Sequence, residues 1–151
     1  MWCFKKSGRQ AIGRSRGGNT TKIHLLSADE RTPIAISLSA GYNHDAPIGR
    51  KLLTLYGKPI EGKVSLIADK AYEGYKNRKQ IADLGYDICI PPKSNRKQPW
   101  SYDKELYKRR NEVERLFRRV KEYRRVFTRY DKLDVMYMGF VLFAFIVEAW
   151  N

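Results

Sequence analysis

The stretch VSLIADKAYEGYKNRKQIADLGYDICI, residues 64–90, decides the fold class. A short apolar run from Val64 to Ala68 is followed by a helical pattern through Leu84 and a second apolar run, Tyr86 to Ile90. A strand, a helix and a strand joined by short links are typical of a βαβ unit with parallel strands. We therefore predict an α/β fold. Asp69 then lies at the carboxyl end of its strand, where open α/β sheets place reacting groups.

The segment before this unit predicts a hairpin and a helix. The short runs Ile23–Ala28 and Ile34–Ser39 are separated by turn-forming residues, and we interpret them as a β-hairpin. Apolar positions recur at helical spacing from Ala46 to Leu55, and Gly57 and Pro59 follow where the helix should end.

The segment after the unit predicts two helices. Pro91–Ser101 is rich in polar residues and is interpreted as an exposed loop. Asp103 to about Val126 lacks Gly and Pro and predicts one long basic helix, and Asp134 to Trp150 predicts the last helix. The apolar run Met136–Val147 would span about 18 Å as a helix, against about 30 Å for the bilayer core. We therefore expect a buried helix and no membrane span.

Composition indicates one basic domain. The chain has 151 residues, 42% of them apolar, and a formal net charge of +14. This is enough apolar material for a single core, and the charge predicts a polyanionic partner, nucleic acid first of all. Cys3 and Cys89 stand apart, which favours neither a disulfide scaffold nor a zinc site and fits a cytoplasmic, nucleoid-associated protein. His24 and His44 are too scattered for zinc, and we expect His24 to be a hydrogen-bonded structural residue.

The first 22 residues are interpreted as a flexible basic arm, and residues 23–151 as the folded domain. Six basic residues and no acid lie between Lys5 and Lys22, with several glycines among them. We expect Arg14, Arg16 and Lys22 to contact DNA phosphates.

The long helix carries a candidate site. Tyr107, Arg110, Glu114 and Lys121 stand at i, i+3, i+7 and i+14, which places them within an arc of about 80°. One face thus presents a carboxylate with two cations and a phenol. The alternative is an ordinary charged helix, in which Arg110 and Glu114 form a pair worth about 0.2–0.5 kcal/mol. Other basic residues of this region point away from that face, toward solvent or phosphates; they include Arg118, Arg119 and Arg125.

Three ordered motifs resemble the DDE transposases of bacterial insertion sequences. The helix matches the Y-x2-R-x3-E-x6-K signature of their Tyr-Arg-Glu-Lys class. GRSRGG-x-TTKIH is present as Gly13–His24, and D-K-x-Y as Asp69–Tyr72. The likeness extends from about Gln10 to Lys132.

This resemblance implies a ribonuclease H-like sheet with flanking helices, which holds two Mg²⁺ or Mn²⁺ ions on carboxylates. Asp69 and Glu114 would be the second and third catalytic acids and metal ligands. Tyr107, Arg110 and Lys121 would bind the DNA end. The implied function is DNA transposition, with metal-dependent strand cleavage and transfer at insertion-sequence ends and into target DNA.

The first acid of the family lies on a central strand before GRSRGG, and Met1–Gly8 contains no acid. Asp29 and Asp45 come too late and are interpreted as turn or helix-cap residues. We therefore expect a partial catalytic domain that lacks its first, central strand, and that is marginally folded alone or completed by another polypeptide, either an upstream-frame product or a homo-oligomer. The alternatives are a catalytically inactive DNA-binding fragment or regulator, and a ribosomal or other RNA-associated basic protein.

Overall fold

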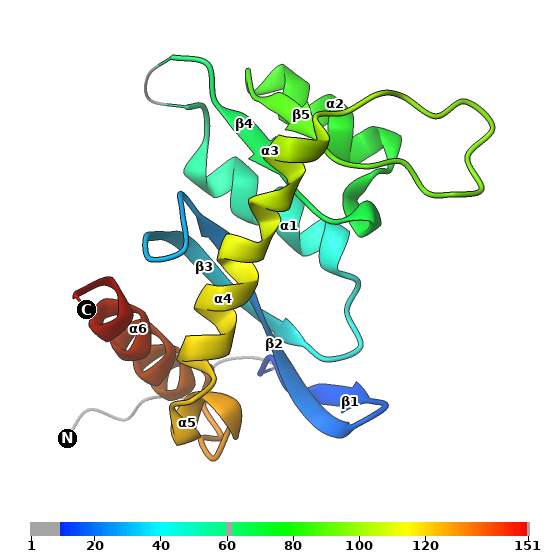
Figure 1. The fold of residues 1–151 in the computed structure, drawn as a ribbon. Helices are drawn as coiled ribbons and strands as arrows, with labels where there is room; N and C mark the ends of the chain where they lie inside the picture. The colour runs from blue at the N-terminus through cyan, green and yellow to red at the C-terminus, as the bar shows by residue number, and fades with distance from the viewer. Residues whose placement is uncertain (1–9, 60–61, 151) are drawn as a thin grey trace.

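The computed structural model describes residues 10–59 and 62–150 and has a mixed α/β fold (Figure 1). The first part contains β1 (Gly13–Ser15), β2 (Gly18–Ser27), β3 (Pro33–Ala40) and α1 (Asp45–Tyr56). The middle part contains β4 (Ser65–Ile67), the 3₁₀ helix η1 (Lys70–Tyr72), α2 (Tyr75–Asp83) and β5 (Asp87–Cys89). The last part contains α3 (Lys104–Lys108), α4 (Arg110–Val120), α5 (Arg124–Phe127) and α6 (Asp134–Trp150).

β1, β2 and β3 form an antiparallel sheet with β2 in the middle. The pairing of β2 with β3 begins at Thr21 opposite Ala40, and it confirms the predicted hairpin. The arm prediction is wrong for Gly13–Lys22. These residues form strands, because β1 pairs with the start of β2 through a tight turn in which Gly18 adopts a φ of +97°. Residues 1–9 of the predicted arm lie outside the described residues.

β4 and β5 form a separate parallel sheet, and η1 and α2 connect them. This confirms the predicted βαβ unit, with strands shorter than the apolar runs. Hydrogen bonding continues beyond both ends of β4: the Asp87 amide donates to the Val64 carbonyl at 2.9 Å, and the Ala68 amide donates to the Cys89 carbonyl at 3.4 Å. Asp69 therefore leaves the sheet at the carboxyl end of β4, as predicted.

Buried apolar side chains gather in two separate clusters. The hairpin cluster lies where α4, α5 and α6 meet β2 and β3. The βαβ cluster lies where α1 and α2 meet β4 and β5. Buried members of the hairpin cluster are Leu116, Val120, Val126, Tyr137, Val141, Ala144 and Phe145. Those of the βαβ cluster are Leu53, Ile81, Tyr86 and Ile90.

The region predicted as one helix from Asp103 to Val126 consists of three helices. The Asp103 carboxylate caps α3 by accepting the Leu106 amide at 2.9 Å. At Arg109 the backbone amide donates to the Leu106 carbonyl, three residues back, and α4 begins at the next residue, Arg110. Tyr123 is extended and separates α4 from α5. The prediction of one continuous helix is therefore wrong. The residues of the candidate face are divided, with Tyr107 on α3, Arg110 and Glu114 on α4, and Lys121 directly after α4.

α6 confirms the predicted last helix. Tyr137, Val141 and Phe145 face the hairpin cluster, whereas Phe143 and Ile146 are exposed on the opposite side. The prediction that the apolar run Met136–Val147 is buried is therefore correct for one face of α6 and wrong for the other. Among the described residues, no helix combines the length and the apolar character needed to cross a membrane.

Candidate functional site

Asp69 and Glu114 come together although 45 positions separate them in sequence. The guanidinium Nη1 of Arg110 lies 2.7 Å from Glu114 Oε1 and 3.8 Å from Asp69 Oδ2. The two carboxylates are about half exposed, at 57% for Asp69 and 48% for Glu114. Both are thus reachable from solvent, and a single cation bridges them. The carboxyl end of β4 supplies one acid and α4 supplies the other.

The two acids line a cleft of about 960 Å³. Its sides are β2, from Thr20 to Leu26, and the end of β4, from Leu66 to Asp69. Residues of α1 and α4 line its other faces. Lining side chains that carry charge are Lys22, Arg50, Arg110, Arg118, Lys121, Asp45, Asp69 and Glu114. A polyanion and its counter-cations would both find partners here.

Tyr107 lies next to this pair on α3. The Arg110 guanidinium carbon is 5.8 Å from the Tyr107 ring centre, and the Tyr102 ring meets it edge-on at 5.6 Å. Burial raises the pKa of the Tyr107 phenol above its usual value, although Arg110 acts against this rise. A phenol with a raised pKa keeps its proton and is able to donate a hydrogen bond.

Lys121 follows the last turn of α4 and lines the cleft, with its Nζ 5.9 Å from the Phe117 ring centre. Arg118 also lines the cleft. Its predicted direction, away from the candidate face, is therefore wrong. The reason is that cleft residues on α4 span Arg110, Val113, Phe117 and Arg118, a broader arc than the polar face.

Tyr72, the last residue of the D-K-x-Y motif, also lines the cleft. Its hydroxyl donates to the Asp45 carbonyl oxygen at 3.4 Å, and burial raises its pKa to about 12. A β-carbon on Gly49 would stand 2.5 Å from the Tyr72 ring, so only glycine leaves room for it. Because the D-K-x-Y spacing was visible, this residue was within reach of motif reasoning.

Lys22, predicted to contact DNA, is held on the cleft wall. Its Nζ donates to Asp45 Oδ1 at 2.9 Å and to the Asn43 carbonyl at 2.8 Å. Arg14 and Arg16 are exposed in the β1–β2 hairpin. Arg125, also predicted to contact DNA, lies 3.7 Å from Asp131 Oδ1 and stays 55% exposed.

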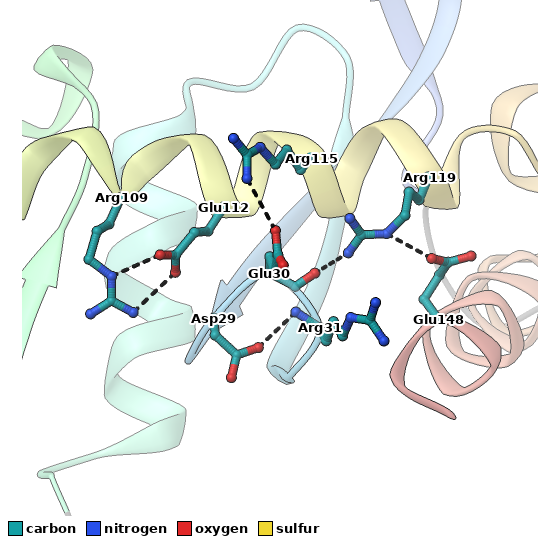
Figure 2. Close-up of polar contacts among 8 residues, drawn as sticks. All are labelled: Asp29, Glu30, Arg31, Arg109, Glu112, Arg115, Arg119 and Glu148. Carbon is teal, nitrogen blue, oxygen red and sulfur yellow. Dashed lines mark hydrogen bonds and ion pairs between the residues drawn. The ribbon is translucent and has the colours of Figure 1, made fainter. Parts of the chain in front are cut away.

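Arg119, predicted to contact DNA, joins α4 to two other elements, as Figure 2 shows. Its Nε donates to Glu148 Oε2 of α6 at 2.9 Å, and its Nη2 donates to the carbonyl oxygen of Glu30 in the β2–β3 turn. Arg115 pairs with the Glu30 carboxylate at 3.5 Å. These contacts fix the side of α4 that faces away from the cleft, so they set the position of Glu114.

The residues set aside as structural behave as predicted. His24 is buried, and its Nε2 lies 2.8 Å from the Ser39 hydroxyl. Desolvation lowers the His24 pKa, so the ring is neutral at physiological pH. Asp29 is a turn residue, whose carboxylate accepts the amides of Arg31 and Thr32 at 2.7 and 2.8 Å.

Glu73 is a buried acid that sequence reasoning missed. It accepts the Lys93 amide at 3.0 Å and pairs with Arg96 at 3.4 Å. The Trp100 indole donates to the Ile90 carbonyl at 2.8 Å, and the Arg78 guanidinium lies 3.9 Å above its ring. The loop predicted as exposed is therefore anchored at both ends. No local signal marks a partner 20 positions away.

Asp69 and Glu114 suit a divalent metal in chemistry, because carboxylate oxygens are the ligands that Mg²⁺ prefers. Arg110 Nη1 lies 2.7 Å from the Glu114 carboxylate and 3.8 Å from the Asp69 carboxylate, so both acids pair with the same side-chain cation. Within the described residues, however, no three His, Cys, Asp or Glu side chains gather closely enough to hold an ion. The pair fits a metal whose remaining ligands are water or groups from elsewhere.

Comparison with known proteins places these residues in a wider context. Residues 3–146 match the family model described as "Transposase DDE domain". A protein of Brucella ovis, described as a transposase for insertion sequence element IS6501, is 32% identical over 123 residues, which cover 81% of this chain and 92% of that relative. No solved structure matches the chain.

Proposed function

Since the chain belongs to the DDE transposase family of insertion sequence elements, we propose that it cleaves DNA strands at the ends of such an element and transfers them to target DNA. One observation carries this proposal. Asp69 and Glu114, the two acids of the matched motifs, share Arg110 Nη1 in an open cleft. Their order along the chain and their meeting point fit one phosphoryl-transfer site.

Asp69 and Glu114 would hold divalent metal, Mg²⁺ or Mn²⁺, which when bound supplies an activated attacking oxygen and neutralises the leaving one. Arg110 keeps the two carboxylates close by offsetting their repulsion. Lys121 and Arg118 would bind DNA backbone phosphates at the cleft. Arg14 and Arg16 would bind further phosphates on the β1–β2 hairpin. Tyr107, which keeps its proton, would donate a hydrogen bond to a phosphate oxygen next to Arg110. Arg119 holds α4 in place and is left out of the DNA contact.

We further propose that the two sheets belong to one ribonuclease H-like arrangement. Supporting this are the antiparallel order β1-β2-β3, the parallel pair β4-β5 and the cleft between β2 and β4. Such a protein would act on DNA in the bacterial cytoplasm.

A second candidate function is DNA binding without cleavage, as a regulator of transposition. The observation that favours it is the small number of candidate metal ligands. Within the described part of the chain, no third His, Cys, Asp or Glu joins Asp69 and Glu114. The cationic side chains of the cleft would still bind phosphate.

The test is a nicking assay on a duplex that carries the terminal sequence of the element encoding the chain. With MgCl₂ present, we expect cleaved ends bearing a 3′-hydroxyl. Asp69→Asn and Glu114→Gln should each lower the rate by at least about 100-fold, the scale on which one essential catalytic group counts. Asp83→Asn and Glu122→Gln, changes at exposed acids outside the cleft, should retain it.

Cleavage that survives both Asp69→Asn and Glu114→Gln would overturn the assignment of these residues. Binding of the duplex with no cleavage by the unsubstituted chain would support the regulator instead. In that case the log of the affinity should fall with the log of salt concentration at about 0.9 per phosphate contact.

A further inference from the structure

The side of α6 that faces away from the hairpin cluster is apolar along its whole length. Eight positions of this helix are exposed within the part of the chain that the structure describes, and none of them carries a charge. They are Val135, Met136, Gly139, Leu142, Phe143, Ile146, Ala149 and Trp150. At about 3.6 residues per turn they fall within an arc of about 140°. We call this surface the outer face of α6.

The two charged residues of α6 lie outside this arc, and each is held by a cation. Asp134 Oδ1 pairs with Arg129 Nη2 at 2.8 Å. Glu148 Oε2 accepts Arg119 Nε at 2.9 Å, and its side chain is 11% exposed. The outer face therefore offers no charge of its own with which to recognise a charged partner.

The outer face is larger than the apolar patches that ordinary protein surfaces carry. Its six large side chains are between 45% exposed, at Leu142, and 89% exposed, at Trp150. Because large apolar side chains have full surfaces of about 150–250 Å², these fractions leave about 800 Å² of apolar area. The largest apolar patch of a typical monomer is about 300–600 Å². A stable interface buries about 800 Å² on each partner, so the outer face alone supplies one side of such an interface.

The spacing of the outer face suits a second helix with the same spacing. Met136, Phe143 and Trp150 recur every seven residues, and Gly139 and Ile146 stand between them at intervals of three and four. Two helices interlock along a seam of this kind. The fitting partner is therefore an uncharged, apolar helix face of similar length, and α6 of a second copy of the chain presents such a face.

We propose that two copies of the chain associate through the outer faces of their α6 helices, related by a two-fold axis. In such a pair both copies use the same surface, so the middle of the face meets its own counterpart. Phe143 stands at the middle of the stretch from Val135 to Trp150 and contacts its copy. Among the residues of α6, Tyr137 alone lines the cleft, and Figure 1 shows α6 apart from β4 and β5. Pairing therefore leaves the cleft of each copy open.

The charge of the chain sets the conditions under which the copies pair. Two copies repel each other, because each has a formal net charge of +14, and salt screens this repulsion. The burial of apolar surface needs no charge, so pairing through the outer face persists or strengthens as salt is added. Association of two copies on one DNA molecule has the opposite dependence, because salt weakens phosphate contacts. Salt therefore distinguishes the two kinds of association.

The test is sedimentation equilibrium of the full chain without DNA, at about 1–100 μM chain and about 0.5 M NaCl. We expect the mass to rise with concentration from that of one chain to that of two. Phe143→Lys should weaken pairing at least about tenfold, because two introduced ammonium groups would meet in the pair. Leu55→Lys, at an 81% exposed position of α1 outside the cleft, is the matched control and should leave pairing unchanged.

A mixture of two variants identifies the occupant of the outer face. Phe143→Glu alone should weaken pairing as Phe143→Lys does. Mixing the two variants should restore pairing, because opposite charges then meet at the two-fold axis. Thermal unfolding at about 1 μM shows whether each variant is folded, and both should unfold close to the unsubstituted chain, because Phe143 is 62% exposed and faces away from the hairpin cluster.

A chain that stays monomeric up to about 100 μM would overturn the proposal, whether the outer face then serves a different protein, a lipid surface or another segment of the chain. Equal weakening by Phe143→Lys and Leu55→Lys would overturn it too, as would a mixture that fails to restore pairing. Pairing that requires DNA and disappears as salt is added would assign the association to the nucleic acid and contradict the outer face. The nicking assay tests Asp69 and Glu114 separately, so either proposal can fail while the other holds.

Discussion

The two parts of the fold that supply the acids are held together differently. Glu114 belongs to a part in which α4 packs on the hairpin cluster and is tied by Arg119 to the β2–β3 turn and α6. Asp69 belongs to a part in which a two-stranded sheet packs on α1 and α2. Between the acids, Arg110 provides the ion pairs across the cleft. Because the site is divided between two parts, the relative position of Asp69 and Glu114 depends on how rigidly each part holds its own acid.

The largest expected effect on stability comes from truncating a large side chain in one of the two buried clusters. Phe145→Ala in the hairpin cluster should lower the free energy of unfolding by about 3–5 kcal/mol, because it leaves a cavity at a fully buried position. Ile90→Ala in the βαβ cluster should cost about 2–5 kcal/mol. Urea unfolding measures both values. If the clusters are separate, hydrogen exchange should quicken first in β2 and β3 for Phe145→Ala and first in β5 for Ile90→Ala; identical patterns would break the comparison.

A smaller effect should follow from releasing α4. Arg119→Ala leaves the Glu148 carboxylate, 11% exposed, without its cation. The expected loss is about 1–3 kcal/mol, the cost of leaving Glu148 Oε2 without its donor, while Oε1 still accepts the Tyr123 hydroxyl. Arg118→Ala, which removes a neighbouring cation without such a partner among the described residues, should change stability by less than about 0.5 kcal/mol. Equal losses in thermal unfolding would show that α4 is not held by Arg119.

The contact between α1 and η1 is the next to test. Gly49→Ala should cost about 1–3 kcal/mol by forcing the Tyr72 ring to move, partly offset by the better helix propensity of alanine. Gly139→Ala is the matched control in α6, where an added β-carbon meets nothing within 4 Å. It should stabilise the chain by about 0.5–1 kcal/mol. Chemical denaturation of both variants distinguishes crowding from propensity, and a stabilised Gly49→Ala would contradict the contact.

The smallest effect concerns the loop anchored by Glu73. The Lys93 amide, followed by the nearby cations, lowers the Glu73 pKa below its ordinary value of 4.5. A carboxylate with a lowered folded-state pKa stabilises the fold above its unfolded pKa and loses that contribution as the pH falls. The stability difference between the unsubstituted chain and Glu73→Gln should therefore be full near neutral pH and shrink below about pH 4.5. A difference that stays constant in urea titrations across this range would contradict the contact.

The features that could be predicted correctly from the sequence are those that local residue patterns encode. The apolar runs on either side of Asp69 predicted the βαβ unit, and the i, i+4 spacing placed Arg110 beside Glu114. It failed where distant contacts decide. The Gly- and Arg-rich stretch Gly13–Lys22 has the composition of an arm, yet strand pairing orders it. Glu73 finds its partners in a later loop, which no spacing rule reveals.

The most direct test of the central claim, that Asp69 and Glu114 form one metal-binding site across the cleft, is a Mn²⁺ titration followed by electron paramagnetic resonance. The samples are the unsubstituted chain, Asp69→Asn, Glu114→Gln and the double variant. If both acids hold a common ion, each single change should weaken binding about tenfold or more, and the double change should add little, since groups that act as one unit are not additive. Additive losses, or unchanged binding in either single variant, would contradict the claim.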